Sequence, residues 1–376
     1  MAHVKTNAAG TRYTGYFRVD GVRLSAGTYD SREEALSKAQ EAERHGTKDY
    51  PPIMTVEAYA EQYLRETPHL TERTKQGYRS LFRRLINPVL GQRLVGELTR
   101  REVRRFLDDL ANTGAGMATV NQCKCAIGSM YKDLVRDDMI LVSPTSHLPN
   151  YSNPPAQFEV VELDEFKAVR EKLPTEGAKL FADFLIALGL RFGEATEARV
   201  KDLTTRRGVT SLMVSRAVSD VGAVNNNGTR FVVLRGTKGA SGRRKVRSVS
   251  MPKVFAQRLQ DWIEANNLSE DDLLFPVALV EPVSRKARVN TTGHLPRDRW
   301  RRIWRKAIKA SKIGWYPRTH DLRHACASHM LEAGASVQEV KDMLGHGSIT
   351  TTAKYLHTLS KQRETTPFDT IWSETA

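Results

Sequence analysis

The sequence predicts a mainly α-helical protein with small β-sheets, an α+β fold of more than one domain. Three observations predict it. The chain has 376 residues, which exceeds the usual size of a single domain. Apolar residues recur at helical spacing through most of the chain. Runs of strand-forming residues are confined to the N-terminus and to an island around residues 211–251.

The composition favours a polyanionic partner. The chain carries 58 Lys and Arg against 43 Asp and Glu, a formal net charge of +15. Each phosphate neutralised by such a surface releases counterions, so nucleic acid is the favoured partner and acidic lipid is the alternative. No apolar run approaches the roughly 20 residues that span a bilayer. We therefore expect no membrane partner and a cytoplasmic location, nucleoid-associated when the protein is on DNA.

Cysteine usage and the N-terminus agree with this expectation. The N-terminal residues lack the apolar core of a signal peptide. The chain has three cysteines and no CxxC pair, which fits a reducing compartment. This count argues against a disulfide framework and against a cysteine-rich zinc site.

Residues 1–46 are predicted to form a small module of strands and one helix. Strand formers occupy residues 13–19, and Asp20-Gly21 is a two-residue hairpin signal. A second strand is expected over 22–26 and a third from there to residue 29. Ser31 and Glu34 then form a capping box that opens a helix. The apolar side of that helix holds Ala35, Leu36, Ala39 and Ala42.

Residues 54–147 are predicted to form an all-helical domain. Thr55 and Thr71 are expected to cap its first two helices, the second of which should end near Asn87-Pro88. Thr99 and Glu102 form a capping box for a third helix, and residues 118–135 supply one or two more.

The helix that begins at Thr71 has a basic outer surface with almost no acid. A basic helix face is usually only solvated, but beside a nucleic-acid partner it becomes a candidate for phosphate contact. We single out Arg79 and Arg83 as DNA-binding candidates.

A proline-rich stretch over 143–155 predicts an extended linker, after which a larger domain occupies residues 157–376. Its first notable segment contains Arg191 and Glu194, which begin a helix after an apolar helix and a Gly-Leu turn. Arg-Glu pairs are common on helix faces, so this segment by itself carries little functional information.

The second segment is a basic hairpin over 231–251. Seven basic residues and no acidic residue lie from Arg230 to Met251. A hairpin can lower Lys238 from its tip into a groove of DNA, and Lys245 is a rival for that part. Arg243 and Arg244 are candidates for DNA contact, although an exposed basic hairpin without function is the alternative.

The third segment contains His320 and Arg323, which share one face at the start of a helix. His320 and His324 have the spacing of an HExxH zinc motif. In that alternative Asp321 would replace the glutamate, and its shorter side chain suits a general base poorly. Arg323 would also place a cation beside the metal, so we expect no metal.

The fourth segment leads to a tyrosine. Ser336 caps a helix that Gly345 ends, and Ser348 is expected to cap a short helix that bears Tyr355. Tyr355 follows His346 by nine residues. The alternative is a tyrosine that simply packs in the core.

These four segments together are similar to the signature of the tyrosine recombinase, or phage integrase, family. The likeness rests on the order Arg-x-x-Glu, hairpin Lys, His-x-x-Arg and Leu-Gly-His followed by Tyr, and on the string LGHGSITTTAKYLH. It covers about residues 157–360. On pattern alone, residues 54–147 resemble the family's core-DNA-binding domain and residues 1–46 resemble the arm-DNA-binding domain of many phage integrases.

The resemblance implies a role for each matching residue. Arg191 and Arg323 would hold the non-bridging oxygens of a DNA phosphate. His320 and His346 would add hydrogen bonds, with His320 also assisting deprotonation of the tyrosine. Lys238 would protonate the departing 5′ oxygen, and Tyr355 would attack to form a 3′-phosphotyrosyl link. Glu194 would orient neighbouring groups without touching DNA, and neither metal nor cofactor is expected.

The implied function is site-specific recombination that integrates and excises a mobile element. The implied partners are double-stranded DNA attachment sites, other copies of the chain in a tetramer on two duplexes, a directionality factor and a host DNA-bending protein. A conjugative transposase and an Xer-type recombinase are alternatives within the family, although the Xer type usually lacks an arm-binding module. A topoisomerase and a non-catalytic DNA-binding protein are alternatives outside it.

Two further stretches concern DNA and assembly. Residues 297–312 hold eight basic residues and one acid, with Trp300 and Trp304 four apart, so one face should be core and the rest basic. Arg301 and Arg305 are the candidates for DNA contact there. In the family, tails such as residues 356–376 often dock on a neighbouring copy, and packing on the same chain is the alternative.

Overall fold

The computed structural model describes residues 2–7, 10–19, 22–45, 54–137, 139–152, 159–222, 230–238, 244–281, 293–353 and 355. The chain divides into two compact units, Met1–Ala156 and Gln157–Ala376. Asp20, Gly21, Arg243 and the tail over 356–376 lie outside the described residues.

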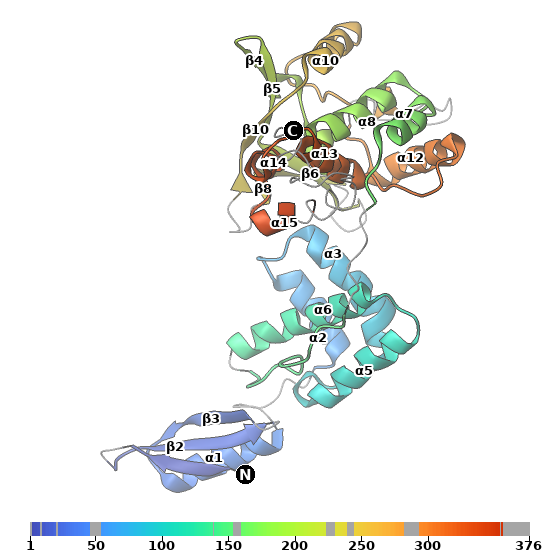
Figure 1. Cartoon of the computed structure of the whole chain (residues 1–376). Helices are drawn as coiled ribbons and strands as arrows, with labels where there is room; N and C mark the ends of the chain where they lie inside the picture. Colours follow the sequence, from blue (N-terminus) through green and yellow to red (C-terminus); the bar gives the residue numbers. More distant parts are fainter. Residues whose placement is uncertain are drawn as a thin grey trace, which may run out of the picture. The chain divides into compact units, whose positions relative to one another are not determined.

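The N-terminal module is an antiparallel sheet with one helix on it. Its order is β1-β2-β3, from β1 (His3–Thr6), β2 (Tyr13–Val19) and β3 (Val22–Tyr29), and α1 (Arg32–His45) packs against it (Figure 1). The expected helix is confirmed, with Ala35, Ala39 and Ala42 buried. The predicted division of residues 22–29 into two strands was wrong. Gly27 adopts φ +118° within one continuous strand, and the third strand is β1.

The helical domain follows in the same unit. Its helices are α2 (Val56–Glu66), α3 (Glu72–Leu81), the π-helix η1 (Phe82–Ile86), α4 (Asn87–Leu90), the 3₁₀-helix η2 (Val95–Glu97), α5 (Arg100–Asn112) and α6 (Met117–Arg136). The predicted caps are confirmed, because Thr55 and Thr71 accept backbone N–H groups and Thr99 forms a capping box with Glu102.

The predicted helix end near Asn87-Pro88 was wrong. The helical path continues from α3 through the π-turn η1 into α4 and ends after Leu90. Pro88 lies in the first turn of α4, where the absence of its N–H costs little helical hydrogen bonding. The core of this domain is one cluster to which α2, η1, α5 and α6 contribute.

The first part of the predicted linker is not extended away from the domain. Tyr151 Oη donates to Asp108 Oδ1 of α5 at 2.5 Å. On α6, Lys124 Nζ donates to Leu148 O at 2.8 Å, and Asn121 Nδ2 donates to Tyr151 O at 2.9 Å. Residues 148–151 therefore pack back on the helical domain, which a composition rich in proline did not reveal.

The C-terminal unit contains helices and four small strand pairings. Its helices are α7 (Leu163–Glu171), α8 (Glu176–Leu188), α9 (Phe192–Glu197), η3 (Val200–Asp202), α10 (Lys253–Ala265), α11 (Val277–Val280), α12 (Arg297–Ser311), α13 (Asp321–Glu332), α14 (Val337–Leu344) and α15 (Ile349–Ala353). Its strands are β4 (Leu203–Arg206), β5 (Val209–Val214), β6 (Arg216–Asp220), β7 (Phe231–Arg235), β8 (Thr237–Lys238), β9 (Arg244–Lys245) and β10 (Arg247–Ser250).

The strands of the basic hairpin diverge into different sheets. β8 pairs with β9, which confirms the hairpin, whereas β7 pairs with β6 and β10 joins β5 and β4. Helices α8 and α13 lie in the middle of the unit, between the sheet β10-β5-β4 on one side and α7 and α12 on the other (Figure 1). Most of the buried apolar side chains of this unit form one large core.

Helix α12 confirms the predicted division of its faces. Trp300 and Trp304 are buried and their rings stack with centroids 5.8 Å apart. Their indole N–H groups donate to Thr319 Oγ1 at 3.1 Å and to Pro317 O at 2.8 Å. In the part of the chain that the structure describes, no helix is long and apolar enough to cross a membrane.

Gly193 is required where α9 approaches β6. A Cβ at this position would lie 2.3 Å from Val218 O, which is backbone and cannot rotate away. We predict that Gly193→Ala lowers the free energy of unfolding of the C-terminal unit by about 1–3 kcal/mol. All five tryptophans lie in that unit, so urea unfolding followed by tryptophan fluorescence measures it. Gly314→Ala is the control, since a Cβ there meets nothing within 4 Å; equal effects of both variants would contradict the prediction.

Candidate active site

The Arg191 segment begins where helix α8 ends. Gly189 closes α8 in the left-handed conformation (φ +57°), and a Cβ there would lie 2.5 Å from Leu344 Cδ2 of α14. Glycine therefore allows the α8–α9 turn and the end of α14 to meet. Arg191 follows as the N-cap of α9, and its side chain is about one-third exposed (36%).

Glu194 lies behind Arg191 and is buried, with 3% exposure. Its Oε2 accepts the backbone N–H of Arg191 at 3.0 Å, and its Oε1 accepts from Arg191 Nη1 at 2.9 Å. Arg247 of β10 donates to the same carboxylate through Nη1 at 3.1 Å and Nη2 at 2.7 Å. Burial raises the pKa of Glu194, but the hydrogen bonds and charges of Arg247 and Arg191 outweigh it and lower the pKa to about 2.

Arg247 joins three segments of the site. Besides its two bonds to Glu194, its Nε donates to Met343 O at 2.8 Å, at the end of α14. It belongs to β10, the strand that follows the hairpin of Lys238. One guanidinium thus links the hairpin, the Arg191 segment and the segment that leads to His346.

Arg323 is almost completely buried, with 2% exposure. Its Nη1 donates to Gly189 O and its Nη2 to Leu344 O, both at 2.6 Å. Burial and the charge of Arg191 lower the pKa of Arg323 to about 10, so the side chain keeps its charge at neutral pH. Gly189 lies two residues before Arg191, and Leu344 follows Met343, whose carbonyl accepts from Arg247. These bonds therefore place Arg323 at the same site as Arg191, Glu194 and Arg247.

Two histidines lie on the first turns of α13. The ring of His320, at the N-cap, meets the ring of His324 edge-on at 4.7 Å between centroids. His320 is exposed, yet partial desolvation of its ring, with the charges of His324 and Arg323, lowers its pKa to about 4. Asp321, which would be the base of a zinc motif, instead accepts from Arg318 Nη2 at 2.9 Å.

Tyr355 and His346 come from the last described segment. The prediction that a helix bears Tyr355 was wrong, because α15 ends at Ala353 and Tyr355 lies in the turn that follows. The Tyr355 ring is buried, with 4% exposure, and it stacks on His346 at 6.3 Å between centroids. Burial raises the pKa of Tyr355, while the charges of Arg323 and Arg191 lower it in part.

His346 is held by a side chain of the helix that follows it, α15. Its Nδ1 lies 2.8 Å from Thr352 Oγ1. Burial, with the charges of Arg323 and Arg191, lowers the pKa of His346 to about 4. The imidazole is therefore neutral at pH 7.

Through the ring contacts and hydrogen bonds described above, the structure brings five of the six predicted catalytic side chains into one cluster: Arg191, His320, Arg323, His346 and Tyr355. For Lys238 and Arg244 it describes the backbone in strands β8 and β9, but not the side chains. The predicted DNA-binding residues Arg83, Arg301 and Arg305 are exposed, and Arg79 lies 3.8 Å from Glu61 in an ion pair. The DNA roles of all these residues stay predictions.

Sequence reasoning missed two residues of this cluster. Arg247 was one of seven cations between Arg230 and Met251, and nothing local marks it as the partner of Glu194. His324 was considered only as a zinc ligand, whereas its Nδ1 lies 2.6 Å from Tyr355 Oη. The run His-x-x-Arg-His carried a signal, since His324 is one turn from His320 on the same helix.

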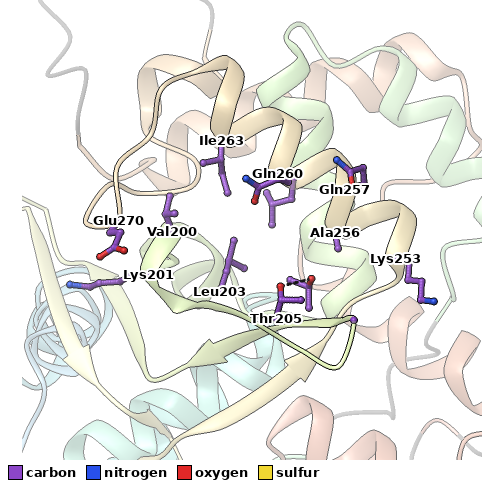
Figure 2. A pocket seen from close by; sticks show the side chains of 13 residues that line it. Val200, Lys201, Leu203, Thr205, Lys253, Ala256, Gln257, Gln260, Ile263 and Glu270 are labelled. Carbon is purple, nitrogen blue, oxygen red and sulfur yellow. Dashed lines mark hydrogen bonds between the residues drawn. The ribbon is translucent and has the colours of Figure 1, made fainter.

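A groove elsewhere in the C-terminal unit holds none of these residues. It has a volume of about 660 Å³ and lies between α10 and the strands β4 and β5 (Figure 2). Lys201, Lys253 and Glu270 are the charged residues that line it. The cationic cluster is therefore separate from this hollow.

Comparison with known proteins gives the family. A sequence model of the phage integrase family matches residues 159–362, and a model described as phage integrase, N-terminal SAM-like domain, matches residues 60–141. The tyrosine recombinase XerD of Rickettsia bellii is 26% identical over 271 residues, which cover 69% of this chain and 79% of that protein.

Solved structures with the same fold are integrases. The Tn1549 transposon integrase, in complex with transposon right end DNA, aligns with a TM-score of 0.62 and 17% identity over 86% of this chain and 98% of that chain. A lambda integrase tetramer bound to a Holliday junction aligns with a TM-score of 0.56 and 15% identity over 94% of each chain. These likenesses show the fold and confirm the predicted α+β class.

Fold and sequence together define an enzyme that cleaves and rejoins DNA with a tyrosine nucleophile, a tyrosine recombinase. Because the family model covers more than half of the chain, the chain belongs to the phage integrase family. The resemblance stated from the sequence motifs is confirmed.

Arg247 should matter for stability as well as for the site. Its removal leaves the buried Glu194 carboxylate with fewer partners, so we predict that Arg247→Ala lowers the free energy of unfolding by about 3–5 kcal/mol at pH 7. The folded-state pKa of Glu194 lies below its ordinary value of 4.5. The stability that ionised Glu194 contributes through its bonds is therefore complete above pH 4.5 and is lost as pH falls toward 2. The difference in unfolding free energy between wild type and Arg247→Ala should therefore be smaller at pH 3 than at pH 7.

Urea unfolding at the two pH values measures this prediction. The control is Lys167→Ala in the same unit, which removes an exposed ion pair to Asp164 at 2.8 Å and should cost less than about 1 kcal/mol. A loss at pH 7 no larger than that of the control would contradict the role given to Arg247.

Proposed function

We propose that Tyr355 is the nucleophile of this recombinase and that the cationic cluster binds the DNA phosphate it attacks. The observation that carries the proposal is that the buried Tyr355 ring lies against the rings of His324 and His346, in the segments that Arg323 joins through Leu344 O. The charges of Arg323 and Arg191 also lower the pKa of its hydroxyl in part. Attack by the hydroxyl on phosphorus leaves a 3′-phosphotyrosyl link and frees a 5′-hydroxyl. The link preserves a phosphodiester, so rejoining needs no nucleotide cofactor.

Arg191 and Arg323 hold the two non-bridging oxygens of that phosphate. Negative charge develops on these oxygens as the nucleophile arrives, and fixed cations stabilise it without reorganising. Arg323 is held by two carbonyls and Arg191 by Glu194. Both guanidinium groups are thus oriented before DNA binds. Glu194 acts through Arg191 and does not touch the phosphate.

The neutral imidazoles of His320 and His346 donate hydrogen bonds to the same phosphate. When the Thr352 hydroxyl donates to Nδ1 of His346, the ring hydrogen lies on Nε2, from which it can be donated to a phosphate oxygen. Lys238 supplies the proton to the departing 5′ oxygen. Its position in β8, which pairs with β9 in the basic hairpin, supports this assignment.

The proposed biological role is integration and excision of a mobile element. Double-stranded attachment sites are the substrates, and four copies of the chain act on two duplexes, as the tetrameric lambda integrase of similar fold is bound to a Holliday junction. The N-terminal module binds separate arm sites, while Arg79, Arg83, Arg243, Arg244, Arg301 and Arg305 contact phosphates. A directionality factor and a host DNA-bending protein complete the assembly, which works in the cytoplasm on nucleoid DNA.

The nucleophile is tested by Tyr355→Phe. We predict that this variant binds DNA as wild type does but forms no covalent protein–DNA adduct, because it lacks the attacking oxygen. The substrate is a set of nicked duplexes that tile the DNA flanking the gene, and adducts are measured on denaturing gels. Tyr316→Phe is the matched control and should form adducts normally, since Tyr316 lies half-exposed beside Arg305.

Adducts formed by Tyr355→Phe would overturn the assignment of the nucleophile. Relaxation by the wild-type chain of a plasmid without any recombination site would favour the topoisomerase alternative instead.

The leaving-group acid is tested by comparing Lys238→Ala with Lys245→Ala. A 5′-sulfur leaving group departs without protonation, so it should restore cleavage to the variant that lost the acid. We predict rescue of Lys238→Ala by at least tenfold and no rescue of Lys245→Ala. Rescue of Lys245→Ala alone would move the acid to that lysine, whose backbone pairs with Thr237 on the same hairpin.

A further inference from the structure

We propose that His324, rather than His320, takes the proton from the Tyr355 hydroxyl as the nucleophile attacks. This inference rests on the function proposed above, in which Tyr355 attacks DNA. It assigns a catalytic role to a residue that the signature of Arg, Lys, His, Arg, His and Tyr leaves out.

The first support is geometric. Nδ1 of His324 lies 2.6 Å from Tyr355 Oη, within the distance that proton transfer requires. His324 stands in the first turns of α13, a helix that packs against α8 and α14, so its backbone is held by the core. The hydroxyl that must lose a proton thus already has a base in contact with it.

His320 is placed differently. Its ring meets the edge of the His324 ring at 4.7 Å between centroids. Among the residues that the structure describes, Tyr355 Oη forms its hydrogen bond with His324 and not with His320. His320 remains suited to a phosphate oxygen.

The second support is the charge around His324. A base must be neutral before it acts, and burial lowers the pKa of His324. Arg323 and Arg318 act in the same direction, while Asp321 opposes them. The other ionisable groups beside it are His320, His346 and Tyr355 itself. Asp321 also gives the imidazolium formed after transfer a nearby counter-charge.

The proposed step balances. The Tyr355 Oη–phosphorus bond forms while the Oη–H bond breaks, and the proton moves to Nδ1 of His324. The phosphorus–O5′ bond breaks at the same time, and O5′ receives a proton from Lys238. In the rejoining reaction the 5′-hydroxyl returns its proton to Lys238, and the imidazolium of His324 returns its proton to Tyr355 Oη.

The test separates proton transfer from positioning. Asparagine places an amide near the position of Nδ1, so His324→Asn can keep a hydrogen bond to Tyr355 but cannot accept a proton. We expect single-turnover adduct formation on the nicked duplexes to fall ~10²–10⁴-fold at pH 7. The remaining rate should rise about tenfold for each pH unit, because the tyrosine then ionises without a base.

Matched variants on the same helix provide the controls. His329→Asn should leave both rate and pH profile unchanged, since His329 contacts Glu332 and Val161 O away from the tyrosine. His320→Asn should lower the rate through the phosphate but keep the wild-type shape of the pH profile. A 5′-sulfur leaving group should not rescue His324→Asn, which distinguishes it from Lys238→Ala.

A second measurement distinguishes loss of the base from loss of side-chain packing. His324→Ala is assayed with a series of added imidazoles, and we expect the cleavage rate to be restored and to increase with the basicity of the imidazole. Melting temperature and equilibrium binding to the same duplex report on folding.

The proposal is overturned if His324→Asn cleaves within threefold of wild type, or if imidazoles give His324→Ala no rescue. Absence of any adduct with the wild-type chain on all duplexes would overturn the proposed function itself, and this proposal with it.

Discussion

One buried carboxylate holds the proposed catalytic cluster together. Glu194 sits between Arg191 and Arg247, and both guanidinium groups donate to it. A lone carboxylate buried to 3% exposure would be strongly unfavourable, and two cations compensate it. Arg323 adds a third positive charge, which donates to the neutral backbone carbonyls of Gly189 and Leu344. Three cations against one anion leave the cluster positive, as the proposed binding of a DNA phosphate requires.

Burial, together with this surplus of positive charge, also sets the protonation state of the imidazoles. Arginine keeps its proton at neutral pH even where burial and the charge of Arg191 lower the pKa of Arg323 to about 10. The histidines respond instead, and the pKa values of His320 and His346 fall to about 4. The arginines therefore supply the positive charge, while the neutral imidazoles can donate or accept a hydrogen bond. The two residue types differ in this way because histidine loses its proton near neutral pH and arginine does not.

Local features of the fold could be predicted because their causes are local. Thr55, Thr71 and Thr99 each cap a helix by bonding to a backbone N–H three residues on, a pattern visible in any short window of sequence. The errors arose where an unusual backbone conformation or a distant partner decided the outcome. Strand β3 continues through Gly27, which has a positive φ, and a π-turn extends the helical path beyond the end expected for it. The Tyr151 side chain bonds to Asp108 and so holds the predicted linker against the helical domain.

For the site, the sequence determined the residue types and their order, and these sufficed for the family, the nucleophile proposed and five members of the cluster. Spacing within a helix or turn is short-range, so a motif such as His-x-x-Arg can be recognised in the sequence alone. Only the tertiary structure decided which side chains meet. Arg247 is 53 positions from Glu194 and His324 is 31 from Tyr355. Those contacts exist because the core brings α9, β10, α13 and the turn after α15 together. Packing between distant segments leaves no local periodicity in the sequence from which such contacts could be predicted.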